Sequence, residues 1–253
     1  MNTVACYKVV ADAQDIVAND DRTLRFDKAS YVLGEYDLNA IEEAVRVASD
    51  TEGRAVLLSA GDARLSDSKL RKAALSRGAA EQFCVVDEGM ARADALQTAA
   101  VLAAALQKIG FDLAFFGEGS ADAYGQQTGA LVGALLGVTV VNAVSAVRVD
   151  GDAVVVERSL EGEVEVLELA APAVISVTSD ANLPRIPQLK DILAAGKKPS
   201  TTWTVDELGA ACAPCVEVTS MLAPQSVARK QVMYEGDVDE AVRSLAADIK
   251  AAK

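Results

Sequence analysis

The sequence predicts an α/β fold: a Rossmann-like, mostly parallel sheet with helices on both faces, an inserted antiparallel hairpin and a C-terminal arm. Three observations predict it. Short apolar runs alternate with helical segments as far as residue 141, which is the pattern of βαβ units. Alternating apolar and polar runs then flank residues 150–152 and 161–162, both of which contain glycine and favour hairpin turns. After Pro199 the periodic pattern ends.

The parallel part can be followed element by element. The short apolar run at residues 4–10 predicts the first strand. After a polar stretch with a short strand at 23–26, Asp37 is expected to cap a helix that has apolar residues at helical spacing. The remaining strands are expected at residues 55–58, 83–86, 113–116 and 138–141, and the remaining helices at 66–77, 93–109 and 126–136. Glycines at 78, 110 and 137 stand where these helices should end.

The second part changes character. Antiparallel strands are expected at residues 146–149, 153–158 and 164–169, and a buried strand at 173–177. A proline-bearing loop leads to a short helix at 189–195. We therefore divide the chain into a nucleotide-binding domain, residues 1–199, and an arm, residues 200–253. The arm is too long for an ordinary loop and ends in an amphipathic helix. An arm lying on another chain explains this pattern, and a disordered tail is the alternative.

Composition excludes several classes of function. The chain has 37 acidic and 24 basic residues, a net charge of −13, which argues against nucleic-acid binding. It contains no histidine, which removes Ser-His-Asp and Cys-His catalysis and the usual metal sites. We expect no metal site and no catalytic residue, so any chemistry must come from a cofactor or another chain. No apolar run is long enough to span a bilayer and no signal peptide is evident, so a cytoplasmic protein without membrane insertion is expected.

Four cysteines offer one motif. Cys6 and Cys84 lie in apolar runs and are expected to be buried. Cys212 and Cys215 form a C-x-x-C pair, which resembles a redox motif. The pair does not follow a strand at the start of a helix, and no second pair completes a zinc site. Two ordinary thiols are therefore favoured over a functional dithiol, and a role for the pair stays open.

Residues 117–129 form the most informative segment. They connect an expected strand to a helix and contain Gly117, Gly119, Gly125 and Gly129. Glycines allow close approach to a ligand, and a helix N-terminus favours a phosphate. Thr128 adds a hydroxyl donor. Asp122, in the same segment, is suited to cap local N–H groups or to bind a ribose hydroxyl. The spacing is neither G-x-G-x-x-G nor a P-loop, so an ordinary strand–helix turn remains the alternative to a nucleotide site.

Several segments together resemble one family. They are residues 6–10 with 15–16, residues 36–44, residues 117–129, and residues 172–177 with 183–193 and 197–199. In this order they resemble the electron transfer flavoprotein beta subunits, and in particular the FixA-type branch. The resemblance implies a Rossmann-like electron carrier rather than an enzyme, paired with an alpha subunit of FixB type that holds most of the redox-active FAD. The beta subunit would carry AMP or, in electron-bifurcating members, a second FAD.

The resemblance also implies particular residues. The nucleotide site would comprise Cys6, Gly34, Glu35, Tyr36, Asp37, Ala60, Asp122, Gly125, Gln126, Gln127, Thr128, Gly129 and Gly133. A docking loop for an acyl-CoA dehydrogenase-like partner would span residues 182–193, with Leu189 as apolar anchor and Arg185 and Ile186 beside it. A core leucine is the alternative for Leu189. Residues 123–125 depart from the acidic residues of many relatives, which leaves AMP and FAD both open.

Two other functions are alternatives to an electron carrier subunit. A stand-alone adenine-nucleotide-binding regulator of universal-stress-like fold would leave the hairpin, the proline-bearing loop and the arm without a role. A nucleotide-dependent enzyme would need a catalytic set that the sequence does not provide. Electron bifurcation and the identity of the electron donor and acceptor are not fixed by the sequence.

Overall fold

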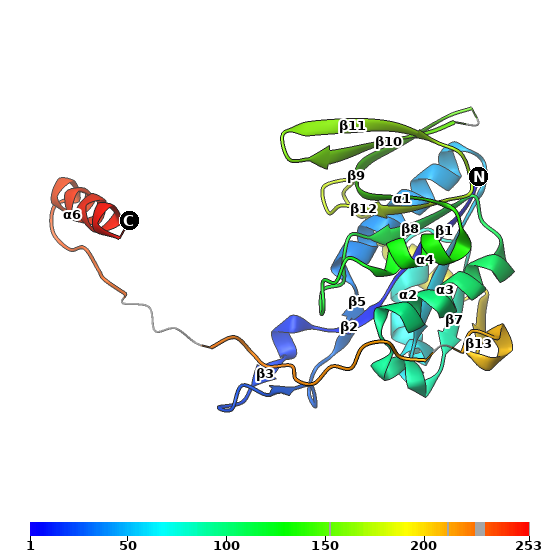
Figure 1. Ribbon diagram of the computed structural model, residues 1–253, viewed down its shortest axis with the longest axis horizontal. Coiled ribbons are helices and arrows are strands. Elements are labelled where there is room, and N and C mark those ends of the chain that lie inside the picture. The colour runs from blue at the N-terminus through cyan, green and yellow to red at the C-terminus, as the bar shows by residue number, and fades with distance from the viewer. Residues whose placement is uncertain (152, 212, 226–230, 253) are drawn as a thin grey trace. The chain divides into compact units, whose positions relative to one another are not determined.

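The computed structural model describes residues 1–151, 153–211, 213–225 and 231–252, and a nine-stranded sheet forms its centre. The strands are β1 Asn2–Cys6, β6 Arg54–Gly61, β7 Glu81–Val86, β8 Leu113–Gly117, β9 Thr139–Asp150, β10 Ala153–Leu160, β11 Glu163–Leu169, β12 Ala173–Val177 and β13 Ser200–Trp203. Their order is β11-β10-β9-β12-β8-β1-β6-β7-β13 (Figure 1). Neighbours from β9 to β13 pair in parallel, whereas β10 is antiparallel to both β9 and β11. The predicted mostly parallel sheet with an antiparallel hairpin is confirmed.

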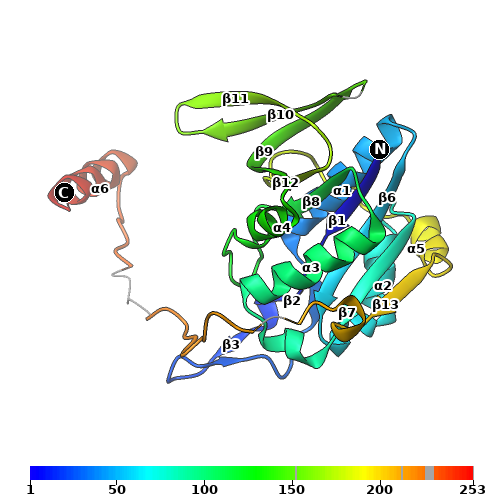
Figure 2. The same ribbon diagram turned by 45° about the vertical axis from the view of Figure 1, so that its right-hand side comes forward.

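Helices cover both faces of this sheet (Figure 2). They are α1 Glu35–Asp50, α2 Ser68–Leu75, α3 Ala95–Ile109, α4 Thr128–Leu136 and α5 Leu189–Ala195. A further helix, α6 Val238–Ala251, lies near the C-terminus of the chain. Short 3-10 turns are η1 Ala13–Asp15, η2 Ala63–Ser66, η3 Glu88–Arg92 and η4 Asp206–Leu208. One apolar core contains buried side chains from α1, α2 and α5, and a second contains side chains from α3 and α4. The two cores lie on opposite faces, because side chains of a strand alternate between faces.

Local sequence signals explain where helices begin and end. Asp94 accepts the Gln97 N–H at 2.8 Å, and Gln97 in turn accepts the Asp94 N–H, which forms a capping box before α3. Asp67 caps α2 by accepting the Lys69 N–H at 2.6 Å. At the other end of α4, Gly137 is left-handed with φ 67°, as predicted for a C-terminal glycine.

Two sequence expectations about elements were wrong. The segments expected as separate strands at 138–141 and 146–149 are one strand, β9. Ala143, with φ 57°, marks an irregularity where the pairing register with β12 shifts, so the break seen in the sequence is a bulge within a strand. The second concerns the strand expected at residues 55–58, which is longer. Residues 59–61 also belong to β6 and pair with β7.

The connection from β1 to α1 forms two small ribbons. Strands β2 Val9–Ala11 and β5 Tyr31–Leu33 pair with each other, as do β3 Val17–Ala18 and β4 Leu24–Arg25.

The chain divides into two compact units. The first comprises Met1–Val17 and Arg25–Ser220, and the second comprises Ala18–Leu24 and Met221–Lys253. Strand β13 lies in the segment expected to form the arm, yet it pairs with β7 in the main sheet. Within the second unit, Thr23 forms a bridge with Leu222. In the part of the chain that the structure describes, no helix has the length and apolar character needed to cross a bilayer.

Candidate functional site

The direction of the sheet order changes at β1. The chain passes from β1 to β6 and β7 on one side and then returns to β8 on the other side of β1. In open α/β sheets, ligands bind outside the carboxyl ends of the strands at such a point. Three segments meet here: residues 7–8 after β1, residues 34–37 at the start of α1, and residues 117–128 between β8 and α4. We call this region the switch-point site.

Asp37 joins these three segments. Its carboxylate Oδ2 accepts the backbone N–H of Lys8 at 2.7 Å, and the carboxylate also accepts the backbone N–H of Gly117. The sequence predicted that Asp37 caps α1, and this is wrong. The helix begins earlier, at Glu35, with Gly34 as N-cap, and Asp37 lies buried in its first turn. Its carboxylate instead accepts the N–H groups of Lys8, just after β1, and of Gly117, at the end of β8.

Burial dominates the electrostatics of this carboxyl. It raises the pKa of Asp37 from 3.8 to about 7, against the opposing effect of the Lys8 and Gly117 N–H groups and of the Lys8 charge. The same environment acts on Cys6 at the end of β1. Burial, and secondarily the charge of Asp37, raises the pKa of the Cys6 thiol, so the thiol stays protonated.

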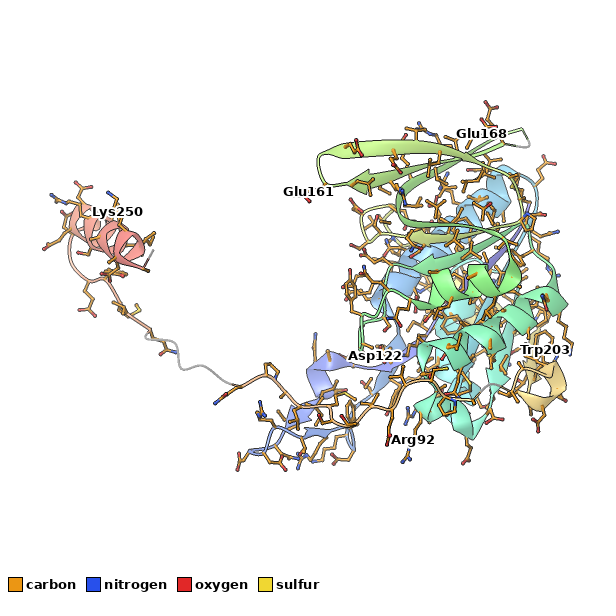
Figure 3. The ribbon with its side chains drawn as sticks, viewed as in Figure 1. Arg92, Asp122, Glu161, Glu168, Trp203 and Lys250 are labelled. Atoms are coloured by element: carbon orange, nitrogen blue, oxygen red, sulfur yellow. The ribbon has the colours of Figure 1, made fainter. Side chains whose placement is uncertain are left out.

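The Lys8 side chain reaches the loop between β8 and α4. Its Nζ lies 2.6 Å from Asp122 Oδ2, and both side chains are about half exposed. Burial opposes ionisation of Asp122, but hydrogen bonds from Lys8 and Ser120 prevail and lower its pKa. Asp122 also accepts the N–H of Ala123 at 2.8 Å, which confirms the expected local capping. Figure 3 shows Asp122 on this loop.

The end of the loop leaves a helix N-terminus open. The sequence predicted a helix from Gln126, but Gln126 is left-handed with φ 54° and α4 begins at Thr128. No side chain caps this N-terminus in the described chain. The first N–H groups of a helix have no intrahelical partner, so they are available to an anion.

The loop glycines have distinct roles. A Cβ on Gly119 would lie 2.6 Å from the Tyr124 ring, so Gly119 is needed for that ring to pack. A Cβ on Gly125 would meet nothing within 4 Å. Tyr124 also faces Tyr36 of α1, with ring centroids 5.1 Å apart. Gly119 is therefore required by packing within the loop, whereas the expected role of Gly125 toward a nucleotide stays a prediction.

Gly129 and Gly133, both expected in the nucleotide site, have a packing explanation. A Cβ on Gly133 would lie 2.0 Å from Val140 Cγ2, and a Cβ on Gly129 would lie 3.3 Å from the Phe116 ring. These glycines bring α4 close to the sheet and so position its N-terminus at the carboxyl end of β8.

A groove adjoins the switch-point site. It has a volume of about 500 Å³ and is lined by Glu35, Tyr36, Leu38, Asn39, Arg77, Ser179, Asn182, Leu183, Pro184 and Ile186. The Asn39 side-chain amide donates to the carbonyls of Ser179 and Asn182, at 3.1 and 2.8 Å. These two bonds tie the loop after β12 to α1.

Sequence reasoning missed Lys8, Asn39 and Asn182. A signal existed for two of them. Lys8 is a cation placed directly after the first strand, and Asn39 is a polar residue on the buried face of α1.

The expected docking residues lie on the loop after β12 and on α5. Leu189 is 72% exposed and Ile186 is 91% exposed, so Leu189 is not a core leucine. Arg185 makes a bidentate contact with Glu42, at 2.7 and 2.8 Å. That contact anchors the loop on α1 and leaves its apolar side chains exposed.

The cysteines divide as the sequence suggested. Cys6 and Cys84 are buried, which confirms that prediction, while Cys215 is exposed. Cys212 lies outside the described residues, so the C-x-x-C motif stays a prediction. Ala60 was also expected in the nucleotide site. It lies at the carboxyl end of β6 and is partly buried.

A parallel sheet with an open helix N-terminus at its switch point is typical of α/β ligand-binding domains. The comparison with known families is more specific. The family model of the electron transfer flavoprotein domain matches residues 23–208, which is more than half of the chain. The chain therefore belongs to the electron transfer flavoprotein domain family, whose members are electron carriers rather than enzymes.

Proposed function

We propose that this chain is the beta subunit of a FixA-type electron transfer flavoprotein and holds AMP or a second FAD in the switch-point site. A FixB-type alpha subunit would hold most of the redox-active FAD. The pair would pass electrons between an acyl-CoA dehydrogenase-like partner and other carriers. Membership of the family supports the class of function. The open N-terminus of α4 at the switch point is the observation that carries the nucleotide site.

The residues of the site fit an adenine nucleotide. The first turn of α4 and the Thr128 hydroxyl would bind a phosphate, and the Lys8 ammonium, which pairs with Asp122 of the same loop, would supply the cation. Asp122 would accept a ribose hydroxyl, since its carboxylate is half exposed. A bound flavin supplies one- and two-electron redox chemistry; this chain binds, orients and shields it.

The exposed docking loop supports a redox partner. Ile186, Leu189 and Leu193 present large apolar surfaces, with Leu193 67% exposed, on a loop held by the Arg185–Glu42 pair. An exposed apolar cluster of this kind is typical of a protein–protein interface.

The proposal is tested on the full-length chain purified with its co-expressed alpha subunit. Heat-released nucleotide is counted by chromatography against flavin. One FAD and one AMP per heterodimer would identify a simple carrier, and two FAD would identify the bifurcating type. Thr128→Val should weaken nucleotide binding by about 1–3 kcal/mol, since a hydrogen bond to a charged group is lost.

Thr201→Val makes the same chemical change on the exposed edge strand β13 and is the matched control. If the wild-type chain carries no nucleotide and Thr128→Val behaves like Thr201→Val, the loop is only a turn. A stable homodimer that binds nucleotide without an alpha subunit would instead indicate a stand-alone regulator.

A further inference from the structure

The Asp37 carboxylate fills a closed space between two strand ends. A Cβ on Gly34 would lie 2.5 Å from its Oδ2, and a Cβ on Gly117 would lie 2.8 Å from its Oδ1. Asp37 is 8% exposed, and both of its backbone donors, Lys8 and Gly117, belong to the chain itself. The carboxylate is therefore enclosed by the chain itself and bonded to its backbone.

Both donors lie where the functional segments begin. Lys8 carries the ammonium that reaches Asp122 at 2.6 Å, and Gly117 starts the loop that ends at the N-terminus of α4. β1 and β8 are neighbours in the sheet, and their pairing ends at Ala5 and Phe115. Asp37 thus replaces the missing ladder contacts just beyond the last paired residues.

We propose that Asp37 is a positioning residue for the nucleotide: its carboxylate sets the spacing of the β1 and β8 ends, and so directs Lys8 and the loop that starts at Gly117 toward the ligand without touching it. This inference rests on the proposed nucleotide site. It revises the role implied by the family resemblance, which placed Asp37 among the residues that contact the nucleotide.

The charges around Asp37 support an indirect role. Cys6 of β1 faces it as a protonated thiol, Lys8 after β1 as a cation, and Asp122 in the loop after β8 as an anion. Lys8 and Asp122 pair with each other, so they offset most of each other's effect. The two backbone N–H groups are then the main partners that favour the ionised form.

The first test is a double-mutant cycle. The full-length chain is purified with its partner, bound nucleotide is removed, and the affinity for AMP is measured. Asp37→Asn keeps the shape but offers fewer acceptor sites, and it should weaken AMP binding about tenfold. In a Lys8→Met background the same change should cost less than about threefold, because part of its effect passes through Lys8. Equal costs in both backgrounds would overturn the inference.

Controls separate positioning from stability. Glu43→Gln alters another buried carboxylate of α1, which accepts the Asn182 amide at 3.0 Å, and it should leave AMP affinity unchanged. Gly117→Ala places a Cβ 2.7 Å from the Tyr36 carbonyl carbon and 2.8 Å from Asp37 Oδ1, so it moves the start of α1 together with the Asp37 carboxylate and should reproduce the loss even if Asp37→Asn does not fold. Wild-type affinity in Gly117→Ala, with Asp37 variants that either fail to fold or bind normally, would overturn the proposal.

The pH dependence of AMP affinity distinguishes positioning from a purely structural role, which would leave this dependence unchanged. Wild-type AMP affinity should fall as the pH drops through about 7, relative to Asp37→Asn, because protonation removes one acceptor oxygen. Titration of the phosphate itself is common to both proteins and cancels in the ratio. A flat ratio, or one of opposite sign, would show that Asp37 does not act by position. A wild-type chain that binds no AMP or FAD would overturn the proposed function and this inference with it.

Discussion

Polar side chains with little exposure hold distant segments of this chain together. The Lys198 ammonium donates to the carbonyls of Leu75 and Ala79, at 2.9 and 2.6 Å, and so satisfies the end of α2. Asp37 accepts backbone N–H groups from two segments, just as Lys198 donates to two backbone carbonyls. In both cases backbone partners reduce the cost of burying a charge, but burial still raises the pKa of Asp37 and lowers the pKa of Lys198.

The stability of the chain should depend on pH through Asp37. Its folded pKa of about 7 lies above the ordinary value of 3.8. The folded state therefore binds the proton more tightly, and this contribution to stability is present at low pH and lost as the pH rises toward 7. Between pH 5 and pH 8, wild type should lose about 3 kcal/mol relative to Asp37→Asn. Urea unfolding of both proteins at the two pH values measures this, and a constant difference would contradict it.

Gly133→Ala tests the packing role of a glycine within α4. The new methyl would lie 2.0 Å from Val140 Cγ2, so α4 must move away from the sheet. We expect a loss of about 1–3 kcal/mol in the free energy of unfolding, as for other overpacked cores. Gly125→Ala meets nothing within 4 Å and serves as the control. Equal stabilities would mean that Gly133 is not required for packing.

Site residues could be predicted from the sequence only where the residues that identify them are close together in the chain. The glycine-rich segment after β8 was recognisable because strand, glycines and helix follow each other in sequence. Lys8 and Asn39 were missed because their partners, Asp122 and Asn182, lie more than a hundred residues away.

Elements were predictable where periodicity was strong. All six α-helices in the described part of the chain were expected, with boundaries that moved by a few residues. β13 was not expected, because Ser200–Trp203 is short and follows a basic, proline-containing turn. Its place is fixed by tertiary contacts instead: Trp203 stacks on Phe83 of β7 with ring centroids 5.1 Å apart. An edge strand of this kind cannot be recognised from its own residues.

At the element scale, the loop after β12 gives a docking prediction. Leu189→Ala should slow electron transfer to the redox partner, with a loss of about 2 kcal/mol in docking free energy, because an apolar anchor is removed. Leu189 is largely exposed in this chain, so stability and flavin content should not change. Stopped-flow reduction by the partner dehydrogenase measures the rate. Val164→Ala truncates a comparably exposed residue on β11 and is the control; equal rates for both variants would exclude Leu189 from docking.

At the scale of the whole molecule, the alternation of strands and helices was enough to predict the parallel sheet and its covered faces. The division of the chain was harder. The sequence placed the end of the domain at Pro199, but β13 and η4 follow it, and the first compact unit continues to Ser220. The compositional change at residue 200 marks the loss of regular periodicity, not the end of the sheet.

Truncation after Ser220 is therefore the appropriate test of the arm. It leaves β13 paired with β7, and Trp203 keeps its contacts with Phe83 and with Lys108, whose Nζ lies 4.6 Å from the ring centroid. The shortened chain should keep the fluorescence of Trp203, its single tryptophan, and an unchanged unfolding midpoint. It should lose association with the alpha subunit, because α6 carries apolar residues at helical spacing, Val238, Val242, Leu245 and Ile249, that suit a partner surface. A chain ending at Pro199 loses the edge strand as well and should be less stable. Full recovery of the alpha subunit with the chain ending at Ser220 would show that the arm is not the interface.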